Sequence, residues 1–264
     1  MKYRGRIAPT PSGFLHMGHA RTFWIAQERC RAAGGTLLYR NEDLDAARCK
    51  PEFHAAALED CRWLGLEWQG EPVNQSDRMN QYQKTFEKLK RDGHLFPCSC
   101  TRKDIQRASK APHSEESEIL YPGTCRQTVT TSEHQPVSWR FHVPDGKIIE
   151  FQDGHFGAQQ FVAGRDFGDF PVWQKNGTPS YQLAVVIDDA AMGITEVVRG
   201  ADLLISTARQ LLLYESLRLT PPAFYHCELM CDEYGKRLAK RHDALSLRNL
   251  RDQGKSPEEL RADW

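Results

Sequence analysis

Hydrophobic and polar residues in the first part of the chain follow a strand, helix, strand pattern. Residues 4–8 predict a short strand, and the proline- and glycine-rich segment 9–13 predicts the loop that ends it. From residue 18 or 19 to residue 33 the chain holds good helix formers with large side chains at helical spacing, and two glycines follow as a stop signal. Residues 36–40 then predict a buried strand. This βαβ order implies a parallel sheet with a ligand crevice at the carboxyl ends of its strands.

Two further amphipathic helices are expected over 51–65 and 80–91. The pattern then changes, because residues 94–165 are rich in proline, glycine, threonine, serine and histidine and contain only short strand-like runs. We interpret this segment as an insertion in the sheet. The earlier periodicity returns after it, and the predicted elements are a buried strand over 181–187, a strand over 196–199 and a helix over 207–219.

The composition is that of an ordinary soluble protein. The 264 residues include 35 Lys plus Arg and 35 Asp plus Glu, so the formal net charge is zero and makes no case for nucleic-acid binding. Basic residues crowd together only locally, at 236–241. No apolar stretch approaches the roughly 18 residues of a membrane span, and the N-terminus leads into no signal-peptide region. We therefore expect a cytoplasmic enzyme without a membrane partner.

The loop between the first strand and the first helix has phosphate-binding character. Free backbone N–H groups and the helix dipole attract phosphate at such a position. His16 and His19 share one face of the first helical turn, and Gly18 between them leaves room for a flat base or ribose. This spacing predicts two donors aimed at one phosphate. Taken alone, such a pair of histidines is more typical of a capped surface helix. The longer motif around it must therefore decide between a surface pair and a phosphate site.

That longer motif resembles the first signature of the class I aminoacyl-tRNA synthetases. Residues 6–21 are similar to the glutamyl and glutaminyl branch, in which HIGH follows an R-x-A-P-[ST]-P-[ST]-G opening. Other segments similar to this branch are 40–45, 181–189, 198–203 and 235–241, the last of which resembles the second signature, the KMSKS loop. The resemblance runs from residue 4 to about residue 250.

The resemblance implies an α/β fold, the Rossmann-type parallel sheet of a class I synthetase catalytic domain. The expected organisation is the first half of the catalytic domain over 1–93, a zinc-binding insertion over 94–165, the second half over 166–220, and a KMSKS-like loop with a short helical C-terminal part over 221–264. No anticodon-binding domain is expected in the chain.

Glutamate is the amino acid that the resemblance implies. It needs a cation for each carboxylate and an acceptor for its ammonium group, and an arginine fork matches a carboxylate by two parallel hydrogen bonds. Arg6, Arg199 and Glu42 supply that set. The implied roles are Arg6 with Tyr181 at the side-chain carboxylate, Arg199 at the α-carboxylate region, and Glu42 with the backbone of Ala8 and Thr10 at the amino group.

ATP would be bound by His16, Gly18, His19, Arg237 and Lys240. Adenylate formation depends on alignment and on cations that meet the developing charge, so no side-chain nucleophile is required. The family implies catalytic roles for the two histidines at the α-phosphate and for Lys240 at the outgoing pyrophosphate. Mg²⁺ would arrive with ATP.

The chain departs from the family pattern at three positions. Val185 stands where the discriminating glutamyl enzymes carry Asn, so one polar contact near the substrate is lost. In the second signature, Arg237 replaces the first Lys and Ala239 replaces Ser, so the charge is kept and a hydroxyl is lost.

Three of the eight cysteines suggest a metal site. Cys98, Cys100 and Cys125 are thiols in a cytosolic context, although a C-x-C spacing leaves free thiols equally open. The resemblance implies a structural zinc with Tyr121 as the fourth ligand. His113 or water competes for that place, because a phenol with a pKa of about 10 must lose its proton to bind. For Cys227 and Cys231, packing is the expected role.

The acceptor follows from the resemblance alone. In length, signatures and insertion the chain resembles the glutamyl-queuosine tRNA(Asp) synthetases, which activate glutamate without tRNA and pass it to queuosine in the anticodon loop of tRNA(Asp). The alternatives are a truncated glutamyl-tRNA synthetase that charges tRNA(Glu), a non-catalytic tRNA-binding paralogue and a simple nucleotidyltransferase. We expect a monomer.

Overall fold

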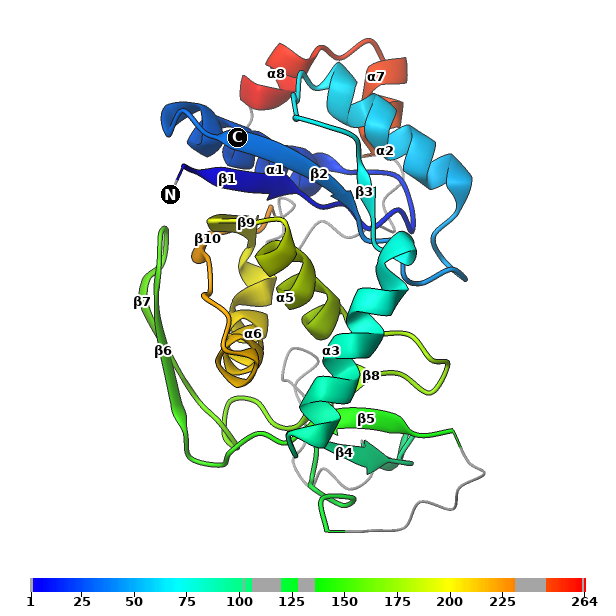
Figure 1. The fold of residues 1–264 in the computed structure, drawn as a ribbon. Coiled ribbons are helices and arrows are strands. Elements are labelled where there is room, and N and C mark those ends of the chain that lie inside the picture. The colour runs from blue at the N-terminus through cyan, green and yellow to red at the C-terminus, as the bar shows by residue number, and fades with distance from the viewer. Residues whose placement is uncertain (1, 102, 106–119, 128–135, 231–245, 263) are drawn as a thin grey trace.

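A parallel sheet with helices packed against it forms the main body of the molecule (Figure 1). The computed structural model describes residues 2–101, 103–105, 120–127, 136–230, 246–262 and 264. Three strands pair in the order β1-β2-β3 and four in the order β7-β6-β10-β9, and all of these pairs are parallel except the β6–β7 hairpin. Their bounds are β1 Arg4–Ile7, β2 Thr36–Asn41, β3 Val73–Asn74, β6 Ile148–Asp153, β7 Gly157–Val162, β9 Glu196–Gly200 and β10 Ala223–Cys227.

The two groups of strands meet at β1 and β9. The N–H of Thr195, just before β9, donates to the carbonyl oxygen of Arg4 at 2.9 Å. From β1 the chain passes through a helix to β2, which lies on the side of β1 away from β9. From β9 it passes to β10, which lies on the side of β9 away from β1. The order of the strands therefore runs in opposite directions from the junction of β1 and β9. In open α/β sheets, such a switch point is where ligands bind.

Helices cover both faces of the sheet. Neighbouring residues of β2 show this, because Leu37 belongs to the hydrophobic cluster formed with α1 and α2, whereas Leu38 packs in a different cluster with Val197 and Phe224. The helices are α1 Met17–Ala32, α2 Pro51–Trp63, α3 Met79–Arg91, α5 Tyr181–Ala191, α6 Leu204–Leu217, α7 Leu247–Asp252 and α8 Pro257–Ala262, with short 3-10 turns at η1 Ser76–Arg78 and η2 Ala201–Leu203.

The prediction of a strand over 181–187 is wrong, because this segment begins the helix α5. Its apolar run is continuous, and a short continuous run cannot distinguish a buried strand from a buried helix. Residues 183–189 are all buried, so the helix has no polar face along this stretch that could have revealed its period. The other helices and strands predicted for the sheet are confirmed to within a few residues at each end.

A second, antiparallel sheet lies at the opposite end of the molecule from β1 and β2 (Figure 1). It has the order β4-β5-β8, with β4 Leu95–Cys98, β5 Ser138–Phe141 and β8 Phe170–Trp173. The β6–β7 hairpin lies between β5 and β8 in sequence, yet it joins the main sheet through the pairing of Asp153 with Phe224. None of the described helices combines the length and apolar character that a bilayer crossing requires.

Candidate active site and metal centre

A cavity of about 530 Å³ opens at the carboxyl ends of β1 and β9, at the switch point of the sheet. The structure brings the residues expected to bind glutamate together with the histidine motif in this one cavity. The predicted residues in its wall are Arg6, Ala8, Thr10, His16, Gly18, His19, Glu42, Tyr181 and Arg199. Residues far apart in the sequence therefore converge on a space of the size that small-molecule sites require.

A buried group of two arginines and two acids adjoins the cavity, and two of its members, Arg6 and Glu42, line the cavity wall. Arg40 donates to Asp189 at 2.6 Å and to Glu42 at 2.9 Å, and Arg6 lies 3.4 Å from the same Asp189 oxygen. Burial opposes ionisation of Asp189, but Arg40 and Arg6 lower the pKa of its carboxyl group. Burial raises the pKa of Glu42, and Arg40 counteracts this shift. The four formal charges balance, which allows the group to remain buried, and Asp188 is a further buried acid at 3.8 Å from Nε of Arg40.

Sequence reasoning missed the roles of Arg40 and Asp189. Arg40 is fully buried and holds Glu42 in place, while Asp189 holds Arg6, whose Nη1 also donates to the carbonyl oxygen of Val198 at 3.0 Å. Both residues lie inside motifs that the resemblance covers, at 40–45 and 181–189, so these motifs could have marked them as site residues. Their positions along the sequence did not show that the two motifs lie side by side in the fold.

Arg199 on β9 has a different environment. It donates to the side-chain oxygens of Thr207 at 2.6 Å, Gln210 at 2.8 Å and Tyr181 at 3.4 Å, and to Nε2 of His226 at 3.2 Å. None of these partners is a carboxylate, and within the described part of the chain Arg199 forms no ion pair. Its charge is therefore available to an anionic ligand in the cavity.

The two histidines of the phosphate loop stand at the start of α1. His16 is the N-cap residue, and its Nδ1 accepts from the N–H of Gly18 at 3.1 Å, while Nδ1 of His19 accepts from the N–H of His16 at 3.3 Å. A neutral imidazole whose Nδ1 accepts carries its proton on Nε2. Both rings, with centroids 3.9 Å apart, thus offer an Nε2–H donor beside the cavity.

Gly18 leaves room for the neighbouring His16 ring, in addition to the room expected for a ligand. A Cβ atom at this position would lie 3.1 Å from Cε1 of His16, which is closer than ordinary side-chain contacts. The absence of a side chain at Gly18 therefore makes room for the His16 ring as well as for a ligand.

Some predicted residues cannot be placed. Arg237, Ala239 and Lys240 lie outside the described residues, as do His113 and Cys231. Val185 follows Tyr181 by one helical turn and is 1% exposed, so it contributes no polar group near the cavity. Cys227 is buried in the cluster that contains Ile7 and Leu247, as its expected packing role requires.

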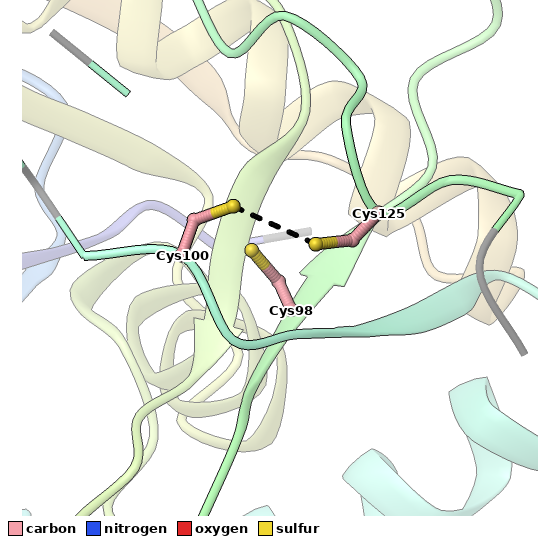
Figure 2. Close-up of side chains that lie close together, drawn as sticks. All are labelled: Cys98, Cys100 and Cys125. Atoms are coloured by element: carbon pink, nitrogen blue, oxygen red, sulfur yellow. Dashed lines mark hydrogen bonds between the residues drawn. The ribbon is translucent and has the colours of Figure 1, made fainter. Parts of the chain in front are cut away.

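The three predicted cysteine ligands come together at one end of the antiparallel sheet. The sulfur atoms of Cys98, Cys100 and Cys125 all lie within 4.8 Å of one another and point toward a common centre (Figure 2). The Cys100 and Cys125 sulfurs are 3.5 Å apart. In a tetrahedral site with metal–sulfur bonds of about 2.3 Å, sulfur atoms are about 3.8 Å apart, so this arrangement fits a metal ion.

Tyr121 lies against the same cluster. Its hydroxyl oxygen is 3.4 Å from the sulfur of Cys98 and 3.8 Å from that of Cys100, and it accepts the backbone N–H of Cys125 at 2.9 Å. Arg140 donates from Nε to the Cys98 sulfur at 3.3 Å. Burial and the neighbouring Cys125 and Cys98 thiols raise the pKa of the Tyr121 phenol, whereas the backbone N–H of Cys125 acts against this shift. The phenol must therefore lose its proton to a metal ion in order to bind it.

Comparison with known proteins places this geometry in a family. The family model described as tRNA synthetases class I (E and Q), catalytic domain, matches residues 2–262. The glutamyl-Q tRNA(Asp) synthetase of Nitratidesulfovibrio vulgaris is 43% identical over 95% of this chain and 82% of its own length. The protein of the same name from Symbiobacterium thermophilum is 45% identical over 96% of this chain and 83% of its own length.

Longer synthetases are also similar. The glutamate–tRNA ligase of Aquifex aeolicus is 36% identical over 98% of this chain and 56% of its own length. The crystal structure of a glutamate tRNA ligase from Elizabethkingia meningosepticum in complex with its amino acid superposes with a TM-score of 0.79 at 27% identity, over 91% of this chain and 52% of that one. The chain thus belongs to the class I tRNA synthetases of the glutamate and glutamine branch, and it contains their catalytic domain.

Proposed function

We propose that this protein activates L-glutamate with ATP, without needing tRNA, and transfers it to queuosine in the anticodon loop of tRNA(Asp). The observation that carries the proposal is the cavity at the β1–β9 switch point. It combines buried arginines and a buried acid with two histidine donors at a helix N-terminus.

The charges of the cavity fit glutamate. Arg6 together with the Tyr181 hydroxyl receives the side-chain carboxylate, and Arg199, which has only neutral partners among the described residues, receives the α-carboxylate. Glu42, fixed by Arg40, accepts the ammonium group with help from the backbone of Ala8 and Thr10. Each charge of the amino acid then meets an opposite charge, which offsets the cost of removing it from water.

Glutamate is activated because the cavity aligns its α-carboxylate with the α-phosphate of ATP. The α-carboxylate oxygen attacks the α-phosphorus of ATP, and pyrophosphate leaves. The Nε2–H groups of His16 and His19 stabilise the negative charge on the α-phosphate, and Gly18 allows ATP to approach. Arg237 and Lys240 bind the outgoing pyrophosphate, and Mg²⁺ enters with ATP and neutralises part of its charge.

The acceptor assignment rests on the relatives. Proteins named glutamyl-Q tRNA(Asp) synthetase match at 38–45% identity, and those from Nitratidesulfovibrio and Symbiobacterium are matched over more than four-fifths of their own length. The second candidate is the charging of tRNA(Glu), which the glutamate–tRNA ligases at 36–38% identity favour. Both reactions share the adenylate step, so only the acceptor distinguishes them.

A structural zinc ion completes the proposal. Cys98, Cys100 and Cys125 hold it, and Tyr121 supplies the fourth ligand. The close approach of the three sulfurs and the phenol oxygen supports this ligand set. We further propose that the protein acts as a monomer, in the cytoplasm where its tRNA and ATP are present.

The function is tested in two steps. ATP–pyrophosphate exchange is first measured with glutamate and no tRNA, and labelled glutamate is then offered with tRNA(Asp) that contains or lacks queuosine, and with tRNA(Glu). We expect exchange without tRNA and transfer only to the queuosine-containing tRNA(Asp). Transfer to both forms of tRNA(Asp) alike, or only to tRNA(Glu), would overturn the assignment.

A matched pair of variants connects the exchange to the cavity. Glu42→Gln should raise the KM for glutamate by about tenfold to a hundredfold, because the ammonium group loses a charged acceptor. The control is Glu67→Gln, since the Glu67 side chain is 83% exposed and its ion pair with Arg31 lies at the surface. Equal KM values for the two variants would contradict the placement of the amino group.

A further inference from the structure

A row of polar side chains lies behind Arg199, on the side away from the cavity. Asp153 and His226 are 1% and 0% exposed, and neither lines the cavity. They come from β6 and β10, and the pairing of these strands explains their alignment. His226 stands directly opposite Arg199 in the β9–β10 ladder, and Asp153 of β6 stands opposite Phe224 of β10. The row thus crosses the three neighbouring strands β6, β10 and β9.

Asp153 determines which imidazole nitrogen of His226 carries the proton. Its carboxylate lies 2.6 Å from Nδ1 of His226 and accepts the backbone N–H groups of His155 at 3.0 Å and Phe156 at 2.9 Å. Burial opposes ionisation, but these donors lower the pKa of Asp153. An ionised carboxylate can only accept, so Nδ1 of His226 carries a hydrogen.

Arg199 determines the state of the other nitrogen. Its Nε–H group always donates, and it lies 3.2 Å from Nε2 of His226. Nε2 must therefore present a lone pair, and the ring is neutral with its single proton on Nδ1. Burial and the charge of Arg199 act in the same direction, because they lower the pKa of His226 to about 4.

This arrangement holds Arg199 without neutralising it. A carboxylate in direct contact would fix the guanidinium group equally well, but it would compete with the carboxylate of the substrate. Because the imidazole of His226 lies between Asp153 and Arg199, Asp153 helps to orient the guanidinium group without forming an ion pair with it. The charge of Arg199 therefore stays available in the cavity. Thr207 and Gln210, also buried and neutral, and the Tyr181 hydroxyl accept hydrogen bonds from the two Nη atoms.

We infer that Asp153 and His226 are positioning residues for glutamate, acting through the orientation of Arg199. The inference rests on the proposed function, because it assumes that Arg199 binds the amino acid. It assigns a purpose to the β6–β7 hairpin as well. The turn of the hairpin begins directly after Asp153, and its N–H groups help to hold that carboxylate in place.

Replacement of His226 tests the inference. His226→Leu removes the hydrogen bonds to Asp153 and Arg199 together with the 3.1 Å contact of Nε2 with the Thr207 hydroxyl, whereas His226→Gln keeps one donor for Asp153 and one acceptor for Arg199. In glutamate-dependent pyrophosphate exchange, we expect His226→Leu to raise the KM for glutamate by about tenfold to a hundredfold, with the KM for ATP changed by less than about twofold. His226→Gln should restore most of the glutamate KM.

Asp153→Asn provides a second, milder variant in case the leucine variant does not fold. Its amide can donate to Nδ1 and so move the ring proton to Nε2, where it opposes the donor of Arg199. We expect a raised glutamate KM here too. The control is Asp60→Asn, which alters a carboxylate that is equally buried but lies in α2, and it should leave both KM values unchanged.

The possible results separate the two proposals. Absence of glutamate-dependent exchange in the unmodified protein would overturn the proposed function itself. Exchange in the unmodified protein, combined with an unchanged glutamate KM in the His226 and Asp153 variants, would overturn only the positioning role. A parallel rise of the KM values for glutamate and ATP, or equal losses for leucine and glutamine, would show a general structural role and contradict the inference.

Discussion

Asp189 offers the sharpest test of the charge balance in the buried group beside the cavity. It is 1% exposed and compensates two buried arginines, with Arg40 at 2.6 Å and Arg6 at 3.4 Å. Asp189→Asn keeps the size of the side chain and removes its charge. Arg6 then loses its ion pair among the described residues, while Arg40 keeps Glu42 at 2.9 Å and Asp188 at 3.8 Å. Leaving a buried charge without its partner typically costs about 3–5 kcal/mol.

The expected loss is large enough to measure by thermal unfolding. For a chain of this length, 1 kcal/mol corresponds to about 2–4 °C, so the Tm should fall by about 6–20 °C. The matched control is Asp45→Asn, because Asp45 also lies 2.6 Å from an arginine, Arg48, but this pair is exposed. Exposed pairs contribute little, so the control should hardly change the Tm. Similar Tm values for both variants would refute the reasoning.

The pH dependence gives an independent check on Asp189. A carboxyl group with a lowered pKa in the folded state contributes stability that is complete above its unfolded pKa of about 3.9. This contribution is lost as the pH falls through the lower folded-state pKa. Burial opposes the shift, but Arg40 and Arg6 produce it. The Tm difference between the unmodified protein and Asp189→Asn should therefore shrink below about pH 4. A difference that stays constant from pH 7 to pH 3 would contradict this account.

Three further predictions concern other parts of the molecule. Gly18→Ala places a Cβ atom 3.1 Å from the His16 ring, so the kcat of pyrophosphate exchange should fall by about tenfold or more, and an unchanged kcat would argue against a role for that ring. Cys100→Ser should reduce bound zinc, measured by mass spectrometry, from about one ion per chain to well below one, and a chelator should lower the Tm of the unmodified protein but not of this variant. Burial raises the pKa of Asp60 to about 6, so its carboxyl group destabilises the fold progressively as the pH rises from about 4 to 6. Asp60→Asn should accordingly raise the Tm at pH 7 and leave it unchanged near pH 4.

Local sequence patterns predicted the elements that carry the site. The strand, helix, strand order at the N-terminus and the glycine stop after α1 depend on spacing within a few residues, so they could be read directly. For the cysteines, the C-x-C spacing left free thiols equally open, and the resemblance selected Cys98, Cys100 and Cys125 as metal ligands. The resemblance then assigned Arg6, Glu42 and Arg199 to one ligand, and all three line one cavity.

The tertiary structure alone decided what surrounds those residues. The apolar run of α5 fits a buried strand and a buried helix equally well, and only packing on every side selects the helix. Asp189 bridges arginines from two strands, and Asp153 reaches Arg199 through His226 across a sheet that the sequence divides among distant segments. Such contacts depend on strand order and register, which arise from pairing between residues far apart in the chain, and no local pattern records them.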